Sequence, residues 1–162
     1  MRITEATAAD WAAIWPFFHR IVAAGETYTY DRDLTEEQGR ALWMCAPPGH
    51  TAVARADDGT VLGTARIQPN HGGPGSHVAN ASYMVDPDHA GRGVGRALCE
   101  YSLDWAARAG YRAMQFNAVV ETNTAAVALY RKLGFTIVGT VPEAFDHPRH
   151  GLVGLHVMHR RL

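Results

Sequence analysis

Three glycines, Gly91, Gly93 and Gly95, alternate with other residues just after an apolar strand and at the start of a predicted helix. Glycine has no Cβ atom, so the backbone can take positive φ values and an anionic group can approach it closely. The first turn of a helix carries N–H groups without intrahelical partners and a partial positive charge, which together favour phosphate. Arg92 and Arg96 add full positive charges. The segment predicts a pyrophosphate site, and the alternative is a turn of this composition that binds nothing.

Two nucleotide-binding motifs do not fit this segment. The dinucleotide fingerprint G-x-G-x-x-G requires a glycine three positions after Gly93, where this chain has Arg96. A Walker loop requires the triplet Gly-Lys-Ser/Thr, which occurs nowhere in the chain. A different phosphate-bearing ligand is therefore expected.

The glycine segment resembles the acetyl-CoA signature of the GCN5-related N-acetyltransferase (GNAT) superfamily, Arg/Gln-x-x-Gly-x-Gly/Ala. Ala90 departs from the usual Arg or Gln, so one side-chain contact is lost or is supplied by Arg92. A second GNAT signature follows later in the chain, in the family's order. The two matching stretches are Ala90-Gly91-Arg92-Gly93-Val94-Gly95 and Asn123-x-x-Ala126-x-x-x-Tyr130-x-x-x-Gly134-Phe135.

The resemblance implies acetyl-CoA as the acetyl donor and assigns residues to it. Met84 and Val85 would offer main-chain hydrogen bonds to the pantetheine arm, which enters between two parted strands. Asn123 would hold the arm from the following helix, and Tyr130 would face the sulfur. The remaining cofactor residues implied are Ala90, Gly91, Arg92, Gly93, Val94, Gly95, Arg96 and Ala126.

Tyr130 is the candidate that assists the leaving thiolate, although a tyrosine at helical spacing also suits simple packing. A free phenol has a pKa near 10, against about 8.5 for a cysteine-like thiol. Full proton transfer at those values would be uphill by about 2 kcal/mol. We therefore expect Tyr130 to donate a hydrogen bond to the thiolate, and to act as a full general acid only if the site shifts one of the two pKa values.

Two asparagines lie inside predicted strands, where asparagine is depleted. A buried amide without partners costs about 1 to 3 kcal/mol, so Asn80 and Asn117 either are satisfied within the core or serve the reaction. Their surroundings resemble the branch of L-azetidine-2-carboxylate N-acetyltransferases, in which the matching asparagines hold the substrate and reaction centre. The segments that carry this resemblance are 75–81, 116–123 and 139–142.

The sequence does not identify the general base that takes the proton from the acceptor amine. Glu26 lies in a connector similar to one that phosphinothricin-type acetyltransferases use for substrate, so it could take the amine proton directly or through water. A solvated loop carboxylate is the alternative for Glu26. His77 and Glu121 are weaker candidates, because only their proximity to the expected site recommends them.

Composition excludes several other classes. Lys plus Arg (15) nearly balances Asp plus Glu (16), and no basic block predicts a nucleic-acid partner. No apolar run approaches a membrane span, and Cys45 and Cys99 form no Cys-x-x-Cys pair, so we expect a soluble cytoplasmic protein. The histidines near residue 147 lack a recognised metal-ligand spacing, so no metal site is expected.

Hydrophobic periodicity predicts the elements that position these residues. One α/β domain over residues 1–162 is expected, with a mixed, mostly antiparallel sheet of six to seven strands and helices on both faces. By the resemblance to the GNAT fold, a central parallel pair is splayed for acetyl-CoA. Pro16 is expected to kink or split the first helix. Strands are predicted at 2–6, 50–56, 60–68, 78–85, 112–119, 135–141 and 152–158, and helices before Gly25, after Thr35, from near Gly93 to Gly110, and from Thr122 or Asn123 to Leu133.

The sequence thus predicts an N-acetyltransferase that moves the acetyl group of acetyl-CoA directly to a small-molecule amine, such as an amino acid or a toxic amino-acid analogue. One alternative is a phosphinothricin-type or antibiotic acetyltransferase with the same cofactor chemistry. The alternative from a different class is a non-catalytic acyl-CoA-binding module. The acceptor amine and the oligomeric state, a homodimer included, stay open.

Overall fold

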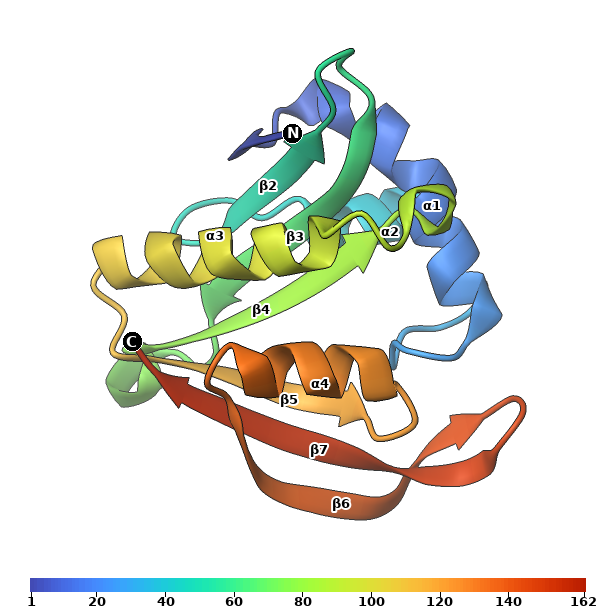
Figure 1. Ribbon diagram of the computed structural model, residues 1–162, viewed down its shortest axis with the longest axis vertical. Helices are drawn as coiled ribbons and strands as arrows, with labels where there is room; N and C mark the ends of the chain where they lie inside the picture. Colours follow the sequence, from blue (N-terminus) through green and yellow to red (C-terminus); the bar gives the residue numbers. More distant parts are fainter.

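The computed structural model describes all of residues 1–162 and contains one sheet that takes strands from both ends of the chain (Figure 1). The strand order is β1-β2-β3-β4-β5-β7-β6, and every neighbouring pair is antiparallel except β4 and β5. The expected mixed sheet with one central parallel pair is confirmed. Its strands are β1 (Arg2–Glu5), β2 (His50–Arg55), β3 (Val61–Pro69), β4 (Val78–Val85), β5 (Ala113–Val120), β6 (Thr136–His147) and β7 (Gly151–Arg161).

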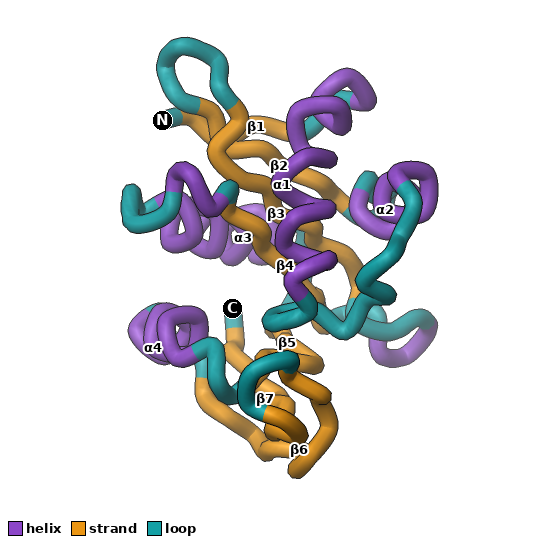
Figure 2. Tube along the Cα trace, turned by 90° about the vertical axis from the view of Figure 1, so that its right-hand side faces the viewer, coloured by secondary structure: helices purple, strands orange, loops and turns teal.

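Helices cover both faces of this sheet, and in Figure 2 α3 and α4 lie on the opposite side of the strands from α2. In β2, Val53 packs with residues of α1 and α2, whereas Ala52 and Ala54 pack with residues of α3. Successive strand side chains point to opposite faces, so α1 and α2 share one face and α3 lies on the other. The helices are α1 (Trp11–Ala24), α2 (Glu36–Trp43), α3 (Val94–Arg108) and α4 (Thr124–Lys132), with short 3-10 turns at Ala8–Asp10, Gly73–Gly75 and Pro87–His89.

The parallel strands β4 and β5 part soon after they meet. Only residues 78–79 of β4 pair with residues 113–114 of β5, although both strands continue well beyond this point. Helix α3 forms the crossover between them, as the strand–helix–strand pattern predicts. Main-chain groups on the facing edges of the two strands therefore lack ladder partners past Ala79, and the expected splay is confirmed.

The first helix is not split at Pro16, because α1 is one continuous helix of 14 residues that includes this proline. Proline in a helix interior removes a hydrogen bond and costs about 3 kcal/mol. Burial of a large apolar side chain contributes about 1.5 to 3 kcal/mol each, and Ile14, Phe18 and Val22 are all buried on one side of α1. The buried face outweighs the proline, so the predicted split does not occur.

The last two strands are longer than predicted. The pairing of β6 with β7 shifts register twice, between residues 137 and 139 and between residues 141 and 145. Such bulges interrupt the alternation of apolar and polar residues from which strands are recognised. Pro142 lies at the second bulge of β6, which is an edge strand of the sheet and can accommodate proline there.

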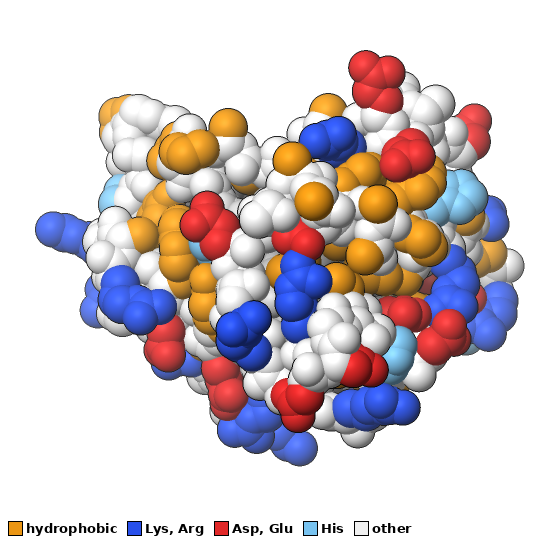
Figure 3. All heavy atoms as spheres, turned by 90° about the horizontal axis from the view of Figure 1, so that it is seen from above, with side chains coloured by type: hydrophobic (Ala, Val, Ile, Leu, Met, Phe, Trp, Pro, Cys, Tyr) orange, Lys and Arg blue, Asp and Glu red, His pale blue; other side chains and the backbone are white.

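No helix in the structure is both long enough and apolar enough to cross a bilayer. On the face shown in Figure 3, acidic and basic side chains are interspersed, and no large area carries a single sign of charge. No group of three or more His, Cys, Asp or Glu side chains is arranged to hold a metal ion.

Candidate active site

The glycine segment forms an open turn at the start of α3. Gly91 and Gly93 have φ values of 76° and 77°, in the left-handed region, and a Cβ atom at either would meet no heavy atom within 4 Å. Gly93 is the N-cap of α3. No N–H group from Gly91 through Arg96 donates a hydrogen bond within the protein, since the first bond of the helix runs from Ala97 N to Gly93 O. Consecutive free amides at a helix N-terminus suit the diphosphate of a coenzyme A.

The two arginines of this turn differ in their freedom. Arg96 Nε lies 2.8 Å from Glu100 Oε1 within α3, so its charge is already paired. Arg92 is exposed and has no acidic partner. Ala90 lines the hollow described next and brings no polar group. Arg92 is therefore the free positive charge at the turn.

A hollow of about 590 Å³ passes between β4 and β5 where these strands part. Residues from both faces of the sheet line it: the connector after α1 contributes Thr27–Tyr30, and α4 contributes Ala126, Leu129 and Tyr130. No Asp, Glu, Lys, Arg or His side chain lines it. Of the predicted site residues, the lining includes Asn80, Met84, Val85, Ala90, Gly95, Asn117, Asn123, Ala126 and Tyr130.

The pairing of β4 with β3 decides which β4 residues can offer main-chain groups to this hollow. Asn70 N donates to Val78 O at 2.8 Å and Asp86 N donates to Leu62 O at 2.9 Å. Directly opposed residues in an antiparallel ladder alternate between bonded and non-bonded pairs, so the even-numbered β4 residues face β3. Tyr83 and Val85 face β5 instead.

This parity does not support the main-chain role expected for Met84. Met84 lies opposite Thr64 in the bonded set, and its side chain is buried among residues of α1 and α2. The main chain of Val85 faces β5 and the hollow, which is compatible with the role expected for it. The carbonyl of Tyr83 accepts a hydrogen bond from the Tyr28 hydroxyl. The Tyr83 N–H has no partner on β5, because the pairing of the two strands ends at Ala79.

Tyr130 lies where α4 faces the gap. Its ring is 4.6 Å from that of Phe116 and 6.0 Å from that of Phe135, between ring centres. The hydroxyl makes no hydrogen bond inside the protein, and burial raises the pKa of Tyr130 well above its usual value, with a smaller contribution from the nearby Cys99 thiol. A phenol that stays protonated can donate a hydrogen bond, so the packing of Tyr130 is compatible with the donor role that the sequence predicts.

The two strand asparagines lie on the hollow in different environments. Asn80 Nδ2 donates to Gln115 O at 2.9 Å, across the gap. Asn117 is exposed and is therefore not an amide satisfied within the core, because the pairing of β5 with β7 shifts register between Phe116 and Val119. Asn117 Nδ2 donates to Asn70 Oδ1 at 2.7 Å. The bulge turns Asn117 toward the hollow, and no pattern in the sequence predicts the bulge.

Asn123 caps α4 as predicted. Its Oδ1 accepts from Ala126 N at 3.3 Å, which leaves the amide Nδ2 available to a ligand. This bond also occupies the Ala126 N–H. Asn123 therefore caps the helix and still has a free amide group in the lining of the hollow.

The candidate bases do not line the hollow. Glu26 Oε1 lies 2.9 Å from Arg149 Nη2, in the turn between β6 and β7, so it is paired with a cation. His77 Nδ1 lies 3.1 Å from Pro74 O, and the Glu121 carboxylate accepts from the Gly154 N–H. None of these three residues is part of the lining of the hollow.

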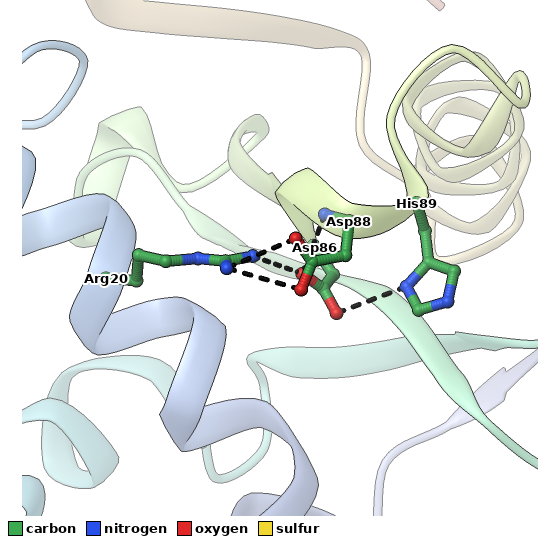
Figure 4. A network of polar contacts seen from close by, with 4 residues as sticks. All are labelled: Arg20, Asp86, Asp88 and His89. Carbon is green, nitrogen blue, oxygen red and sulfur yellow. Dashed lines mark hydrogen bonds and ion pairs between the residues drawn. The ribbon is translucent and has the colours of Figure 1, made fainter.

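One cluster that the sequence did not reveal holds the loop before the glycine turn (Figure 4). Arg20 of α1 reaches both Asp86, at 2.7 Å, and Asp88, at 3.3 Å. Asp86 also accepts from the Asp88 N–H and lies 3.1 Å from His89 Nδ1. Because Arg20 and Asp86 are far apart in the chain and form no motif, only the folded structure brings them together.

An open helix N-terminus beside a passage between parted strands defines a protein that binds a long ligand with a diphosphate end. A family model described as the acetyltransferase (GNAT) family matches residues 11–135. The chain therefore belongs to the GNAT family of acetyltransferases, which confirms the acetyl-CoA-dependent N-acetyltransferase class expected from its two motifs.

Individual relatives agree with this assignment. A GCN5-related N-acetyltransferase from Kribbella flavida is 62% identical, with a TM-score of 0.97 over 99% of this chain and 97% of that one. The yncA protein of Salmonella typhimurium, solved with its cofactor acetyl-CoA, is 26% identical, with a TM-score of 0.84 over 100% and 94% of the two chains. An L-methionine sulfoximine/L-methionine sulfone acetyltransferase of Salmonella typhimurium is 29% identical over 146 residues, 88% of this chain and 84% of the relative.

Proposed function

We propose that this enzyme transfers an acetyl group directly from acetyl-CoA to the amine of a small molecule, an amino acid or a toxic amino-acid analogue. The observation that carries the proposal is the passage between β4 and β5. Free amides lie at the start of α3, and the lining of the passage includes Tyr130 and the connector after α1. Support for the acceptor class comes from the relative that acetylates methionine sulfoximine and methionine sulfone.

The residues that would bind acetyl-CoA come from α3, α4 and β4. The free N–H groups from Gly91 to Arg96, with Arg92, would hold the diphosphate, and the main chain of Val85 and the Asn123 amide would hold the arm. When bound, acetyl-CoA supplies a thioester whose carbon–sulfur bond breaks as the acceptor nitrogen bonds to the acetyl carbon. The proton that this nitrogen then loses would pass through water to the departing thiolate, which leaves as the CoA thiol. The Tyr130 hydroxyl would donate a hydrogen bond to the departing sulfur.

The acceptor side belongs to the polar residues of the strands. Asn80 and Asn117 would orient the acceptor and the reacting carbonyl, as the resemblance to the azetidine-carboxylate branch implies. No ionisable side chain other than tyrosine lines the passage, so the acceptor would lose its proton to water and enter as the neutral amine. Burial among apolar walls favours that form, because desolvation disfavours a charged ammonium. Glu26 does not line the passage, so it would act only through water.

The test is an assay of CoA thiol release from acetyl-CoA over a panel of amines. The panel contains amino acids, proline analogues, phosphinothricin-like compounds and an aminoglycoside. Amine-dependent release with a small amino acid or analogue supports the proposal. Tight CoA binding without turnover on any amine would identify an acyl-CoA-binding module instead.

A further inference from the structure

A second hollow, of about 670 Å³, lies beside the first, between the end of α2 and the end of β3. Its lining includes Met44, Cys45, Gln68, Arg66 and Asn70. No acidic side chain lines either hollow. Nothing in the reaction proposed above uses this second space.

Arg66 in this lining is a half-buried cation without a counter-ion. Arg20, Arg55, Arg96 and Arg149 each pair with a carboxylate, but Arg66 has no Asp or Glu within salt-bridge distance. Its only hydrogen bond runs from Nη1 to the Tyr30 hydroxyl at 3.2 Å, and its Nε is buried without an acceptor. Leaving a charged group unpaired is costly where it is shielded from water, so an anion beside the buried Nε would stabilise this guanidinium.

Asn70 presents a second donor of the same kind. Its Nδ2 is buried without a hydrogen-bond acceptor, while its Oδ1 accepts from Asn117 Nδ2 at 2.7 Å. Buried polar groups in proteins are nearly always paired, so two orphaned donors on residues of one hollow call for a ligand oxygen. A carboxylate has two acceptor oxygens, so one oxygen can accept from a guanidinium and the other from an amide.

Two hydrogen bonds join the second hollow to the first. Arg66 bonds to Tyr30 and Asn70 bonds to Asn117, and both Tyr30 and Asn117 line the passage between β4 and β5. A molecule with its amine in the passage could therefore extend a carboxylate into the second hollow, whose lining carries both donors. We infer that Arg66 and Asn70 form the binding site for the acceptor's carboxylate, so the substrate is an amino acid rather than a simple amine. This inference rests on the proposed function and narrows it.

The test compares an amino acid that is acetylated in the panel with its own carboxamide, in wild type and in variants. The measured quantity is the ratio of kcat/KM for the acid to that for the amide. Comparing this ratio between proteins cancels the different basicity of the two amines. Arg66→Met is expected to lower the ratio by about 10- to 100-fold, since hydrogen bonds between charged groups are worth roughly that factor. Arg66→Lys should lower it less.

Two further variants keep the test decisive. Asn70→Asp places a negative charge in the hollow and should lower the ratio even if Arg66→Met does not fold. Arg108→Met removes an exposed arginine at the end of α3 and should leave the ratio unchanged. An unchanged ratio in the folded Arg66 or Asn70 variants overturns the carboxylate site, while continued turnover leaves the acetyltransferase proposal standing.

A binding measurement covers the case of no turnover with any amine. Calorimetry would compare an N-acetylated amino acid with its amide, on wild type and Arg66→Met. Tighter binding of the acid by the wild type alone supports the site. Equal binding of the acid and the amide, or no binding of either, overturns it without reference to catalysis.

Discussion

Arg20 Nη2 lies 2.7 Å from Asp86 Oδ1, so helix α1 on one face of the sheet is tied to the loop that leads into α3 on the other. The loop carries the residues immediately before the glycine turn. An exposed ion pair contributes little to stability, about 0 to 1 kcal/mol, and the partial exposure of Arg20 puts this pair in that class. Its importance is positional, because it fixes where the free amides begin.

Arg20→Met is expected to weaken CoA binding by about threefold to tenfold, since ordering the loop would then be part of the binding step. The melting temperature should change little. Calorimetry with CoA and a thermal unfolding curve measure the two effects, and Arg108→Met is the matched control. Unchanged CoA affinity would show that the loop needs no such support.

Tyr130→Phe should lower kcat by about 10- to 100-fold, at the lower end of what a positioned donor contributes. Thermal stability should stay nearly the same, because the hydroxyl has no partner inside the protein. Tyr111→Phe, which changes a tyrosine that packs against Trp105 away from the passage, controls for loss of a hydroxyl. A Tyr130→Phe enzyme with wild-type kcat would remove the hydroxyl from the reaction.

Asn117→Ala should lower kcat/KM by about tenfold, because it removes both a group on the passage and the partner of Asn70. Asn117→Asp keeps the shape and the acceptor oxygens but loses the donor to Asn70. If both variants retain wild-type kinetics with every accepted amine, the bulge in β5 is structural only.

The pH dependence of kcat/KM should follow the acceptor. With no ionisable base on the passage, the rate should rise about tenfold per pH unit until the pKa of the free amine is reached. Changing the acceptor to a less basic amine should move the plateau to lower pH. Glu26→Gln should leave the profile in place, and a profile that loses its acidic limb in this variant would make Glu26 the base.

Stability below neutral pH should depend on His50. This side chain is buried, bonds to the Tyr101 hydroxyl at 2.9 Å and stacks on Trp105, and burial lowers the pKa of His50, opposed in part by Glu5. In the window between the folded and unfolded pKa values the unfolded chain binds more protons. The contribution of His50 to the free energy of unfolding is therefore fully present above about pH 6.5 and is lost as the pH falls toward the lowered pKa of the folded state.

The check on His50 is the free energy of unfolding measured from pH 7.5 to pH 5 for wild type and His50→Gln. The difference between the two proteins should shrink toward acid pH. A difference that stays constant across this range would show that His50 does not titrate differently in the two states.

Much of the cofactor side could be predicted because its residues lie close together in the sequence. The strand, the glycine turn and the helix are consecutive, and Asn123 caps the helix that carries Tyr130. Which β4 residues face the gap could not be predicted, because that depends on the register with β3. Arg66 and Arg20 belong to no motif, and their roles come from partners brought in by folding. The bulge at Asn117 likewise exists only in the pairing with β7.

The sheet is joined across its middle by only two residue pairs, at 78–79 and 113–114. A ligand lying along the gap would add the missing hydrogen bonds and would bind the folded state alone, so it should raise the unfolding temperature. The bound acetyl donor would then stabilise the sheet by linking β4 to β5. Each catalytic cycle would stiffen the protein when the acetyl donor enters and loosen it when the spent coenzyme departs.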